Sequence, residues 1–169
     1  ATGTGTVSVL KDATLAGNGT IAGLVLLQDR AHLAPGTSAG NLTVGALTLA
    51  TTSMLDYELG AVGTADLTTI TSPGGLSLTG LATVNVTALA GFGAGRYPLL
   101  DYTGAFAGSP ANLSIGAAPA GYIYSFVNNL ANTSIDLVVA IPEPSSLSIT
   151  LLMCLAAWLL TRDRRRTVS

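Results

Sequence analysis

Two carboxylates, Asp56 and Glu58, have the spacing best suited to chemistry. They stand two positions apart, so in an extended strand their side chains share one face. Glycosidases use a pair of carboxylates in this way, one as acid and one as base or nucleophile. The same pair also fits a solvated strand face or the end of a polar ladder, and no further acid or base stands immediately around it.

Other catalytic and metal-binding patterns are missing. His32 is the only histidine, so no histidine cluster can form, and its place near Pro35 predicts a surface loop. The single cysteine, Cys154, can form no disulfide within the chain. The glycines precede no Gly-Lys-Ser/Thr phosphate-loop signature, and the Gly-Gly-x-Gly-x-Asp calcium repeat is absent. We therefore expect no catalytic residue, no metal and no cofactor.

An apolar stretch near the C-terminus predicts a membrane anchor. From Ser145 to Thr161 no side chain is charged. At about 1.5 Å per residue, this stretch covers about 26 Å of a bilayer core near 30 Å. Trp158 lies near its end, where an amphipathic ring suits the membrane interface. The sequence predicts a transmembrane helix over 145–161; a buried C-terminal helix of a soluble domain is the alternative.

A basic tail over 162–169 follows this stretch. It contains an arginine cluster that only Asp163 interrupts, made of Arg162, Arg164, Arg165 and Arg166. Cytoplasmic flanks of membrane helices collect Lys and Arg. We therefore expect the tail to lie in the cytoplasm and the preceding domain to lie in the periplasm.

The residues Pro142, Glu143 and Pro144 separate the domain from the apolar stretch. The two prolines prevent helix continuation and remove backbone donors, which predicts an extended segment just outside the membrane. Glu143 is the only ionisable side chain between Asp136 and Arg162 apart from Cys154 inside the apolar stretch. We expect its charge to carry much of any recognition of this segment.

Pro142-Glu143-Pro144, the apolar stretch and the arginine cluster together resemble the PEP-CTERM sorting domain of proteins exported by Gram-negative bacteria. The resemblance covers residues 141–169 and lies in the order of the three parts. Ile141 stands where Val is usual, and Asp163 breaks the arginine run. The resemblance implies recognition near Pro-Glu-Pro by an exosortase-like membrane protease-transpeptidase. It also implies a mature protein at the cell surface or in extracellular polysaccharide.

Composition bounds what the remaining residues, 1–140, can be. Charged residues make up 9% of the 169 and hydrophobic residues 49%. Before Pro142 the apolar residues come in short pieces, which excludes a protein with several membrane spans. Low charge and many β-branched residues argue against disorder and against a helical bundle. Acidic residues outnumber Lys11, Arg30 and Arg96 in this part, so nucleic acid is not expected as a partner.

Short alternating runs predict a mainly β domain over 1–140. The expected strands cover 6–10, 15–23, 24–27, 42–44, 47–49, 54–59, 67–70, 76–78, 83–86 and 135–139. The Pro-Gly chemistry of 33–40 predicts a turn. Strands this short, punctuated by Gly and Asn, favour a β-solenoid with an irregular repeat, and a jelly roll or sandwich is the alternative.

The runs within 15–60, among them 16–23 and 33–49, resemble the strand repeats of autotransporter passenger domains. That resemblance implies a right-handed parallel β-helix and no particular activity. From residue 91 aromatic residues become frequent, and we expect 96–140 to form longer antiparallel strands within a cap over 91–140. A sugar-binding platform is the alternative for the aromatic side chains there, Tyr97, Tyr102, Tyr122 and Tyr124.

The sequence therefore predicts an exported, non-enzymatic structural or adhesive protein with a β-solenoid ectodomain over 1–140 and a sorting signal over 141–169. The expected partners are the membrane, the sorting protease and extracellular polysaccharide. Two alternatives stay open. One is a surface enzyme that degrades polysaccharide with Asp56 and Glu58, and the other is a tail-anchored membrane protein that is never processed.

Overall fold

The computed structural model describes residues 3–143, and this part of the chain is almost entirely β-structure. It contains fourteen strands and one short 3-10 helix, η1 (Pro110–Asn112). The prediction of a mainly β chain is therefore confirmed. Across 3–143 no helix has the length and apolar character needed to cross a membrane. The predicted helix over 145–161 and the basic tail lie outside the described residues.

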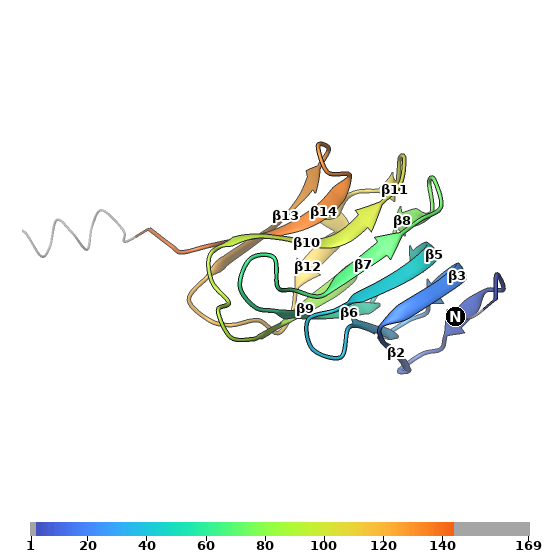
Figure 1. Cartoon of the computed structure of the whole chain (residues 1–169), viewed down its shortest axis with the longest axis horizontal. Coiled ribbons are helices and arrows are strands. Elements are labelled where there is room, and N and C mark those ends of the chain that lie inside the picture. Colours follow the sequence, from blue (N-terminus) through green and yellow to red (C-terminus); the bar gives the residue numbers. More distant parts are fainter. Residues whose placement is uncertain (1–2, 144–169) are drawn as a thin grey trace, which may run out of the picture.

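The strands form two sheets (Figure 1). The larger has nine strands: β1 (Val7–Val9), β3 (Gly19–Leu27), β5 (Asn41–Leu49), β7 (Leu67–Ile70), β8 (Leu76–Leu78), β10 (Gly95–Tyr102), β11 (Ala107–Gly108), β13 (Ile123–Asn129) and β14 (Ser134–Ala140). The smaller has five: β2 (Thr14–Gly17), β4 (His32–Pro35), β6 (Met54–Leu59), β9 (Ala82–Ala88) and β12 (Leu113–Ile115).

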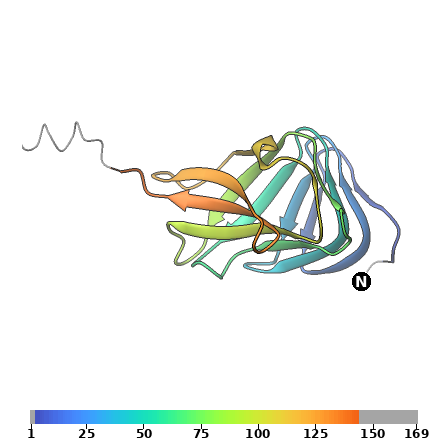
Figure 2. The same cartoon turned by 90° about the horizontal axis from the view of Figure 1, so that it is seen from above.

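The chain moves back and forth between the two sheets as it advances. Strands β1, β3, β5, β7 and β10 are neighbours in the larger sheet, and β2, β4, β6, β9 and β12 are neighbours in the smaller one. All of these neighbours pair in parallel. Each turn of the chain therefore stacks on the one before it, along the long axis in Figure 1. Figure 2 shows the same stack turned by 90°, with β13 and β14 at the end from which the chain leaves.

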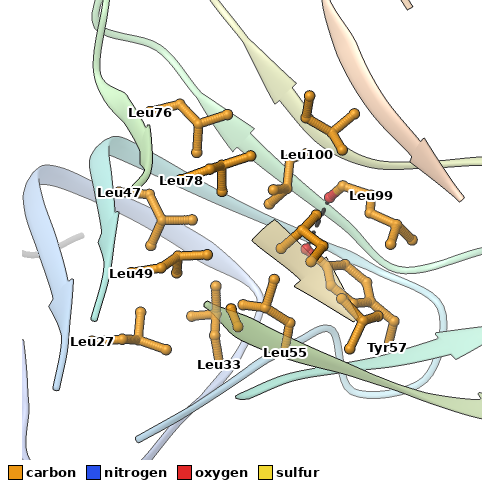
Figure 3. Packing of buried hydrophobic residues seen from close by; sticks show 14 of the residues in the cluster. Leu27, Leu33, Leu47, Leu49, Leu55, Tyr57, Leu76, Leu78, Leu99 and Leu100 are labelled. Carbon is orange, nitrogen blue, oxygen red and sulfur yellow. Dashed lines mark hydrogen bonds between the residues drawn. The ribbon is translucent and has the colours of Figure 1, made fainter. Parts of the chain in front are cut away.

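Inward side chains of paired strands form apolar columns between the sheets. In the larger sheet Val25 pairs with Leu47, and Leu47 pairs with Leu76. In the smaller sheet Leu33 pairs with Leu55. All five side chains are buried, and Figure 3 shows the leucines of the two sheets converging on one interior. Removing this apolar surface from water, turn after turn, is the main force that holds the stack together.

One polar side chain crosses this interior. The ring of Tyr57 on β6 is buried, and its hydroxyl donates to the carbonyl of Leu99 at 2.9 Å (Figure 3). The same hydroxyl lies 3.0 Å from Oγ1 of Thr68 on β7. Burial raises the pKa of Tyr57 well above its usual value, so the phenol stays neutral. Tyr57 thus ties the smaller sheet to β7 and β10 without an unpaired polar atom.

Two of the predicted strands form one continuous strand, and Gly45 lies between them. The runs 42–44 and 47–49 belong to a single strand, β5, whose register against β3 shifts between Ile21 and Leu24. A side chain at position 45 would collide with the carbonyl oxygen of Ala22. Glycine is required there because the backbones of neighbouring turns approach closely.

Strand β4 corrects the predicted turn over 33–40. Leu33 and Pro35 point inward and are buried, and β4 pairs in parallel with β2 on one side and β6 on the other. The turn begins directly after Pro35, at Gly36, whose positive φ of 93° suits glycine. Pairing with β2 and β6 makes 32–35 a strand, and the Pro-Gly sequence alone gives no sign of this pairing.

The final strands change the direction of pairing. Strand β14 is antiparallel to β10 and to β13, so antiparallel strands are present in the predicted range 96–140. Within the same range, β11 and β12 pair in parallel with β8 and β9, which the sequence did not predict. The parallel winding therefore ends in a hairpin. That this region serves as a cap stays a prediction.

Candidate functional site

The predicted sorting residues begin directly after the last strand. Strand β14 ends at Ala140, and Ile141, Pro142 and Glu143 are exposed and form no regular secondary structure. Pro144 and the four arginines of the tail, Arg162, Arg164, Arg165 and Arg166, lie outside the described residues. The part of the signal that the structure describes is thus accessible from solvent.

A buried carboxylate fixes the strand from which this segment emerges. Asp136 on β14 is fully buried and accepts hydrogen bonds from Ser134 Oγ at 2.5 Å and from Asn129 Nδ2 at 2.9 Å. Arg96 of β10 donates to it from Nη1 at 3.2 Å. A buried charge is tolerated only when it is paired and hydrogen-bonded in this way. Asn129 on β13 and Arg96 on β10 hold β14 from both sides, whereas Ser134 lies on β14 itself. These contacts define where the exposed segment starts.

The carboxylates Asp56 and Glu58 border a shallow cleft on the outer side of the smaller sheet. The strand β6 alternates inward and outward residues, so the prediction that the two side chains share a face is confirmed. The cleft has a volume of about 210 Å³. Small residues form part of its lining, which consists of Ala16, Ala34, Pro35, Gly36, Asp56, Tyr57, Glu58, Asp66 and Thr87.

Asp56 is held on both sides by residues from neighbouring turns of the chain. Its Oδ2 lies 2.6 Å from Nδ1 of His32, and its Oδ1 accepts from Nδ2 of Asn85 at 2.7 Å. Asn85 in turn accepts from the backbone N–H of Ala117 at 2.9 Å. These contacts form a polar ladder that runs across the strands. The prediction of a loop position for His32 is wrong, because His32 begins strand β4 and is half-buried.

Asp66 adds a third carboxylate to the cleft, and its role is structural. Its Oδ1 accepts from the N–H of Gly40 at 2.9 Å, and its Oδ2 accepts from the N–H of Glu58 at 2.8 Å. Burial raises the pKa of Asp66, and the two N–H donors act in the opposite direction. A side chain at Gly36 would collide with this carboxylate. Asp66 thus joins the turn at 36–40 to the end of β6.

These contacts limit the chemistry that the cleft can perform. Both oxygens of Asp56 and both oxygens of Asp66 already accept hydrogen bonds from the protein. Within residues 3–143 no group of three His, Cys, Asp or Glu side chains is arranged to hold a metal ion. Glu58 remains as the carboxylate with most freedom to meet a solute.

The aromatic residues of the C-terminal region pack mainly against one another. Tyr97 and Tyr102 are buried. Phe92 stacks on Tyr97 with ring centroids 5.7 Å apart and meets Tyr122 edge to face at 5.3 Å. Tyr124 is half-buried, and its hydroxyl donates to the carbonyl of Pro119 at 2.7 Å. The packing interpretation of these rings therefore fits better than a flat sugar-binding platform.

Sequence reasoning missed the residues that surround Asp56. His32 and Asn85 lie 24 and 29 positions away from it along the chain, and Asp66 lies 8 positions away from Glu58. No local motif connects such residues. A repeat of constant length would have aligned them, but the turns of this chain differ in length.

Comparison of the chain with models of protein families, with curated proteins and with solved structures finds no match, so its function has to be inferred from its own residues.

Proposed function

We propose that this chain is an exported, non-enzymatic protein of the cell surface or extracellular matrix, with a structural or adhesive role. Its C-terminal signal, Pro142-Glu143-Pro144 with the apolar stretch and the arginine cluster, directs its sorting. The observation that carries the proposal is the exposure of Pro142 and Glu143 directly beyond the firmly held strand β14.

This arrangement suits recognition by a membrane protease. Pro142 lacks a backbone donor, so the segment resists joining the sheet that ends at Ala140. Glu143 offers one charge on an otherwise uncharged stretch between β14 and the apolar segment. An exposed, extended segment with a single acidic side chain is a distinctive shape for an exosortase-like enzyme at the periplasmic face of the inner membrane.

The proposed fold of the ectodomain is a right-handed parallel β-helix of the kind that autotransporter passengers contain. The alternation of strands between two sheets and the parallel pairing within each sheet support it. The single membrane segment would take the place of an autotransporter's translocating domain. Such a scaffold is rigid and repetitive, which suits a structural element better than a catalyst.

A row of hydroxyl groups on the larger sheet supports an adhesive role toward polysaccharide. Thr20, Thr43 and Thr69 occupy matching positions on β3, β5 and β7. Their side chains point outward, and neighbouring strands lie about 4.8 Å apart. Thr69 also donates to Oδ1 of Asn41 at 3.2 Å. A regular row of hydroxyls can exchange hydrogen bonds with a polymer that is itself rich in hydroxyls.

The sorting proposal is tested by comparing native protein with the Glu143→Ala variant in cells that carry the matching sorting enzyme. We expect native protein to reach the cell surface and the variant to accumulate at full length in the inner membrane. Glu58→Ala removes a half-buried carboxylate on strand β6, outside the signal, and serves as the control. Equal release of the native and Glu143→Ala proteins would contradict the proposed role of Glu143.

Orientation is tested separately with a reporter enzyme that is active only in the periplasm. Fused after Ser169, the reporter should be inactive, because the arginine cluster holds the C-terminus in the cytoplasm. Replacing the four arginines with neutral residues should weaken this bias. Strong reporter activity on the native chain would reverse the proposed topology.

The two carboxylates at the cleft suggest a second candidate function, that of a surface enzyme that cleaves polysaccharide. The backbone positions of adjacent outward residues on a strand are about 6.6 Å apart, close to the lower limit of about 6.5 Å for the separation of the two carboxyl groups in inverting glycosidases. If the native protein cleaves a polysaccharide, the pair Asp56→Asn and Glu58→Gln should abolish cleavage. Absence of cleavage by the native protein across a panel of bacterial polysaccharides favours the structural role.

The third candidate is a tail-anchored protein that is never processed. It shares the topology of the sorted protein but keeps Trp158 and the arginines in the mature chain. The reporter experiment cannot separate these two, whereas the length of the mature chain can.

A further inference from the structure

Three loops without any charged residue lie at one end of the described domain. They cover 60–65 between β6 and β7, 89–95 leading into β10, and 116–123 leading into β13. Their residues are Gly, Ala, Val, Thr, Leu, Phe, Pro, Tyr and Ile. We call these loops, together with Ile141, the uncharged rim.

Contacts between the loops make the rim a continuous surface. A side chain at Gly91 would touch Ala61, and one at Gly95 would touch Val62. Phe92 meets Tyr122 edge to face at 5.3 Å. Residues far apart in the sequence therefore form one edge of the molecule, at the left in Figure 1.

The chain leaves the domain through this same rim. Strand β14 runs back toward it, so that Val139 pairs with Gly95, and Ala140 pairs with Ile123. The chain then continues through Ile141 toward the uncharged stretch that begins at Ser145. Figures 1 and 2 both show the exit on the side of these loops.

The rim exposes large apolar side chains to solvent. Val62 is 60% exposed, Ile123 is 57% exposed and Ile141 is 67% exposed. Beside them lies a hollow of about 150 Å³, lined by Gly63, Ala65, Leu67, Tyr97 and Pro98. Exposed apolar side chains gathered at one edge indicate a surface that meets another apolar phase.

Two turns at the other end of the strands, beside β1 and β3, carry charged side chains. Strand β3 begins near the rim side and ends at a turn where Arg30 pairs with Asp12 at 2.7 Å. In the same group of turns Lys11 lies 3.9 Å from Asp29. These two turns are charged, whereas none of the three rim loops contains a charged residue.

We propose that the uncharged rim rests on the surface of a lipid bilayer while the chain is anchored. This inference depends on the proposed function in one respect, because it takes the apolar stretch from Ser145 to Thr161 as the anchor. The few residues between β14 and that stretch leave the rim little distance from the membrane. Loops without charges lose little hydration there, and Val62, Ile123 and Tyr122 gain an apolar or interfacial environment. Glu143 is then held close to the headgroups, at the level where a membrane protease acts.

The test places a single tryptophan at chosen points of the full chain. Trp158 is the only tryptophan, so Trp158→Phe gives a silent background for Val62→Trp and, independently, Ile123→Trp. Leu130→Trp is the control, because Leu130 is 77% exposed at the far end of the β13–β14 hairpin. Each variant is reconstituted in phosphatidylcholine vesicles with or without lipids that carry a nitroxide near the headgroup. Flotation of the vesicles reports anchoring separately.

We expect both rim tryptophans to lose roughly twofold more emission to the nitroxide lipids than the control, since interfacial side chains sit within the headgroup region. If the chain floats with the vesicles but rim and control tryptophans are quenched equally, the rim proposal fails and the anchor stands. A rim tryptophan that is shifted to the blue but not quenched would mean that a second copy covers the rim, which also overturns the proposal. If the chain does not float, both the anchor and the rim proposal fail.

Discussion

The wound region, β1 to β9, and the terminal hairpin, β13 and β14, hold their residues in place by different means. In the wound region buried leucines and valines stack in register, and no single contact dominates. In the hairpin a fully buried Asp136 gathers Ser134, Asn129 and Arg96 around one carboxylate. The first arrangement tolerates a degenerate sequence, whereas the second depends on particular polar residues.

The difference teaches how a stack of parallel strands can be ended. Each strand of the wound region leaves an edge for the next turn of the chain to pair with. The hairpin occupies that edge at β10 and reverses the direction of pairing. Exposed edges invite pairing with other chains, so we expect the network that fixes β14 to protect the end of the stack, and this role as a cap stays a prediction. The same network also sets the point from which Pro142 and Glu143 emerge.

The largest effect is expected in the wound region. Leu55 is fully buried and pairs with Leu33 and Val84. Leu55→Ala should reduce the free energy of unfolding by about 3 kcal/mol, because it leaves a cavity in the column. Urea unfolding measures the change. Leu81→Ala, at a side chain that is 61% exposed, should change stability little. Equal losses for the two variants would show that the columns are not the main source of stability.

Alanine substitutions at two glycines compare a tightly packed strand with an open loop. Gly45→Ala should cost about 2 kcal/mol, because its Cβ would meet the backbone of Ala22 on the neighbouring strand. Gly93→Ala is the matched control, since a Cβ at Gly93 meets nothing within 4 Å. Thermal unfolding of both variants gives the comparison. A destabilised Gly93→Ala variant beside an unchanged Gly45→Ala variant would reverse the account of where the chain is tightly packed.

In the hairpin, Asp136→Ala should cost about 1.5 kcal/mol, because it removes the shared acceptor from Ser134 and Asn129. Arg96→Ala should cost less, since half of the Arg96 side chain is exposed to solvent. Hydrogen exchange should increase in β13 and β14 of the Asp136 variant, with β3 and β5 unaffected. Uniform loss of protection would mean that the hairpin and the wound region unfold as one unit.

The smallest expected effect is a gain in stability. Burial, with a further contribution from nearby Asp136, raises the pKa of Asp101. Because the pKa of Asp101 is higher in the folded protein than in the unfolded chain, the protonated carboxyl contributes to stability at low pH. This contribution is lost as the pH rises through the pKa of the folded state. Asp101→Asn should therefore raise the melting temperature slightly at pH 7. The difference should shrink as the pH falls toward about 4, where the unfolded-state carboxyl protonates. A difference that grows toward acid pH would contradict the stated cause.

Much of the strand pattern could be predicted from the sequence, because the core lies between two sheets and each strand buries alternate residues. The predicted runs 67–70 and 76–78 match β7 and β8, since turn residues limit both runs. Strand β4 was missed because Pro35 and Gly36 signal a turn, while the pairing that makes 32–35 a strand comes from β2 and β6. Pairing between distant turns has no local signature.

The same reason limits what could be predicted of the cleft. Asp56 and Glu58 could be placed on one face because two positions along a strand fix their relation. His32 and Asn85 join Asp56 only because β4, β6 and β9 stack, and the turns between these strands have unequal lengths. A sorting signal over 141–169 is predicted from composition and the order of its parts alone, and both the signal and its processing stay predictions.

The most direct test of the central proposal is the mass of the mature protein. Native protein recovered from the surface of cells that carry the matching sorting enzyme should end close to Pro142-Glu143-Pro144. It should therefore lack the apolar stretch with Trp158 and the arginine tail. Intact-mass spectrometry with peptide mapping of the C-terminus measures this. A mature chain that still contains Trp158 and Arg166 would contradict sorting by cleavage and leave a simple membrane anchor in its place.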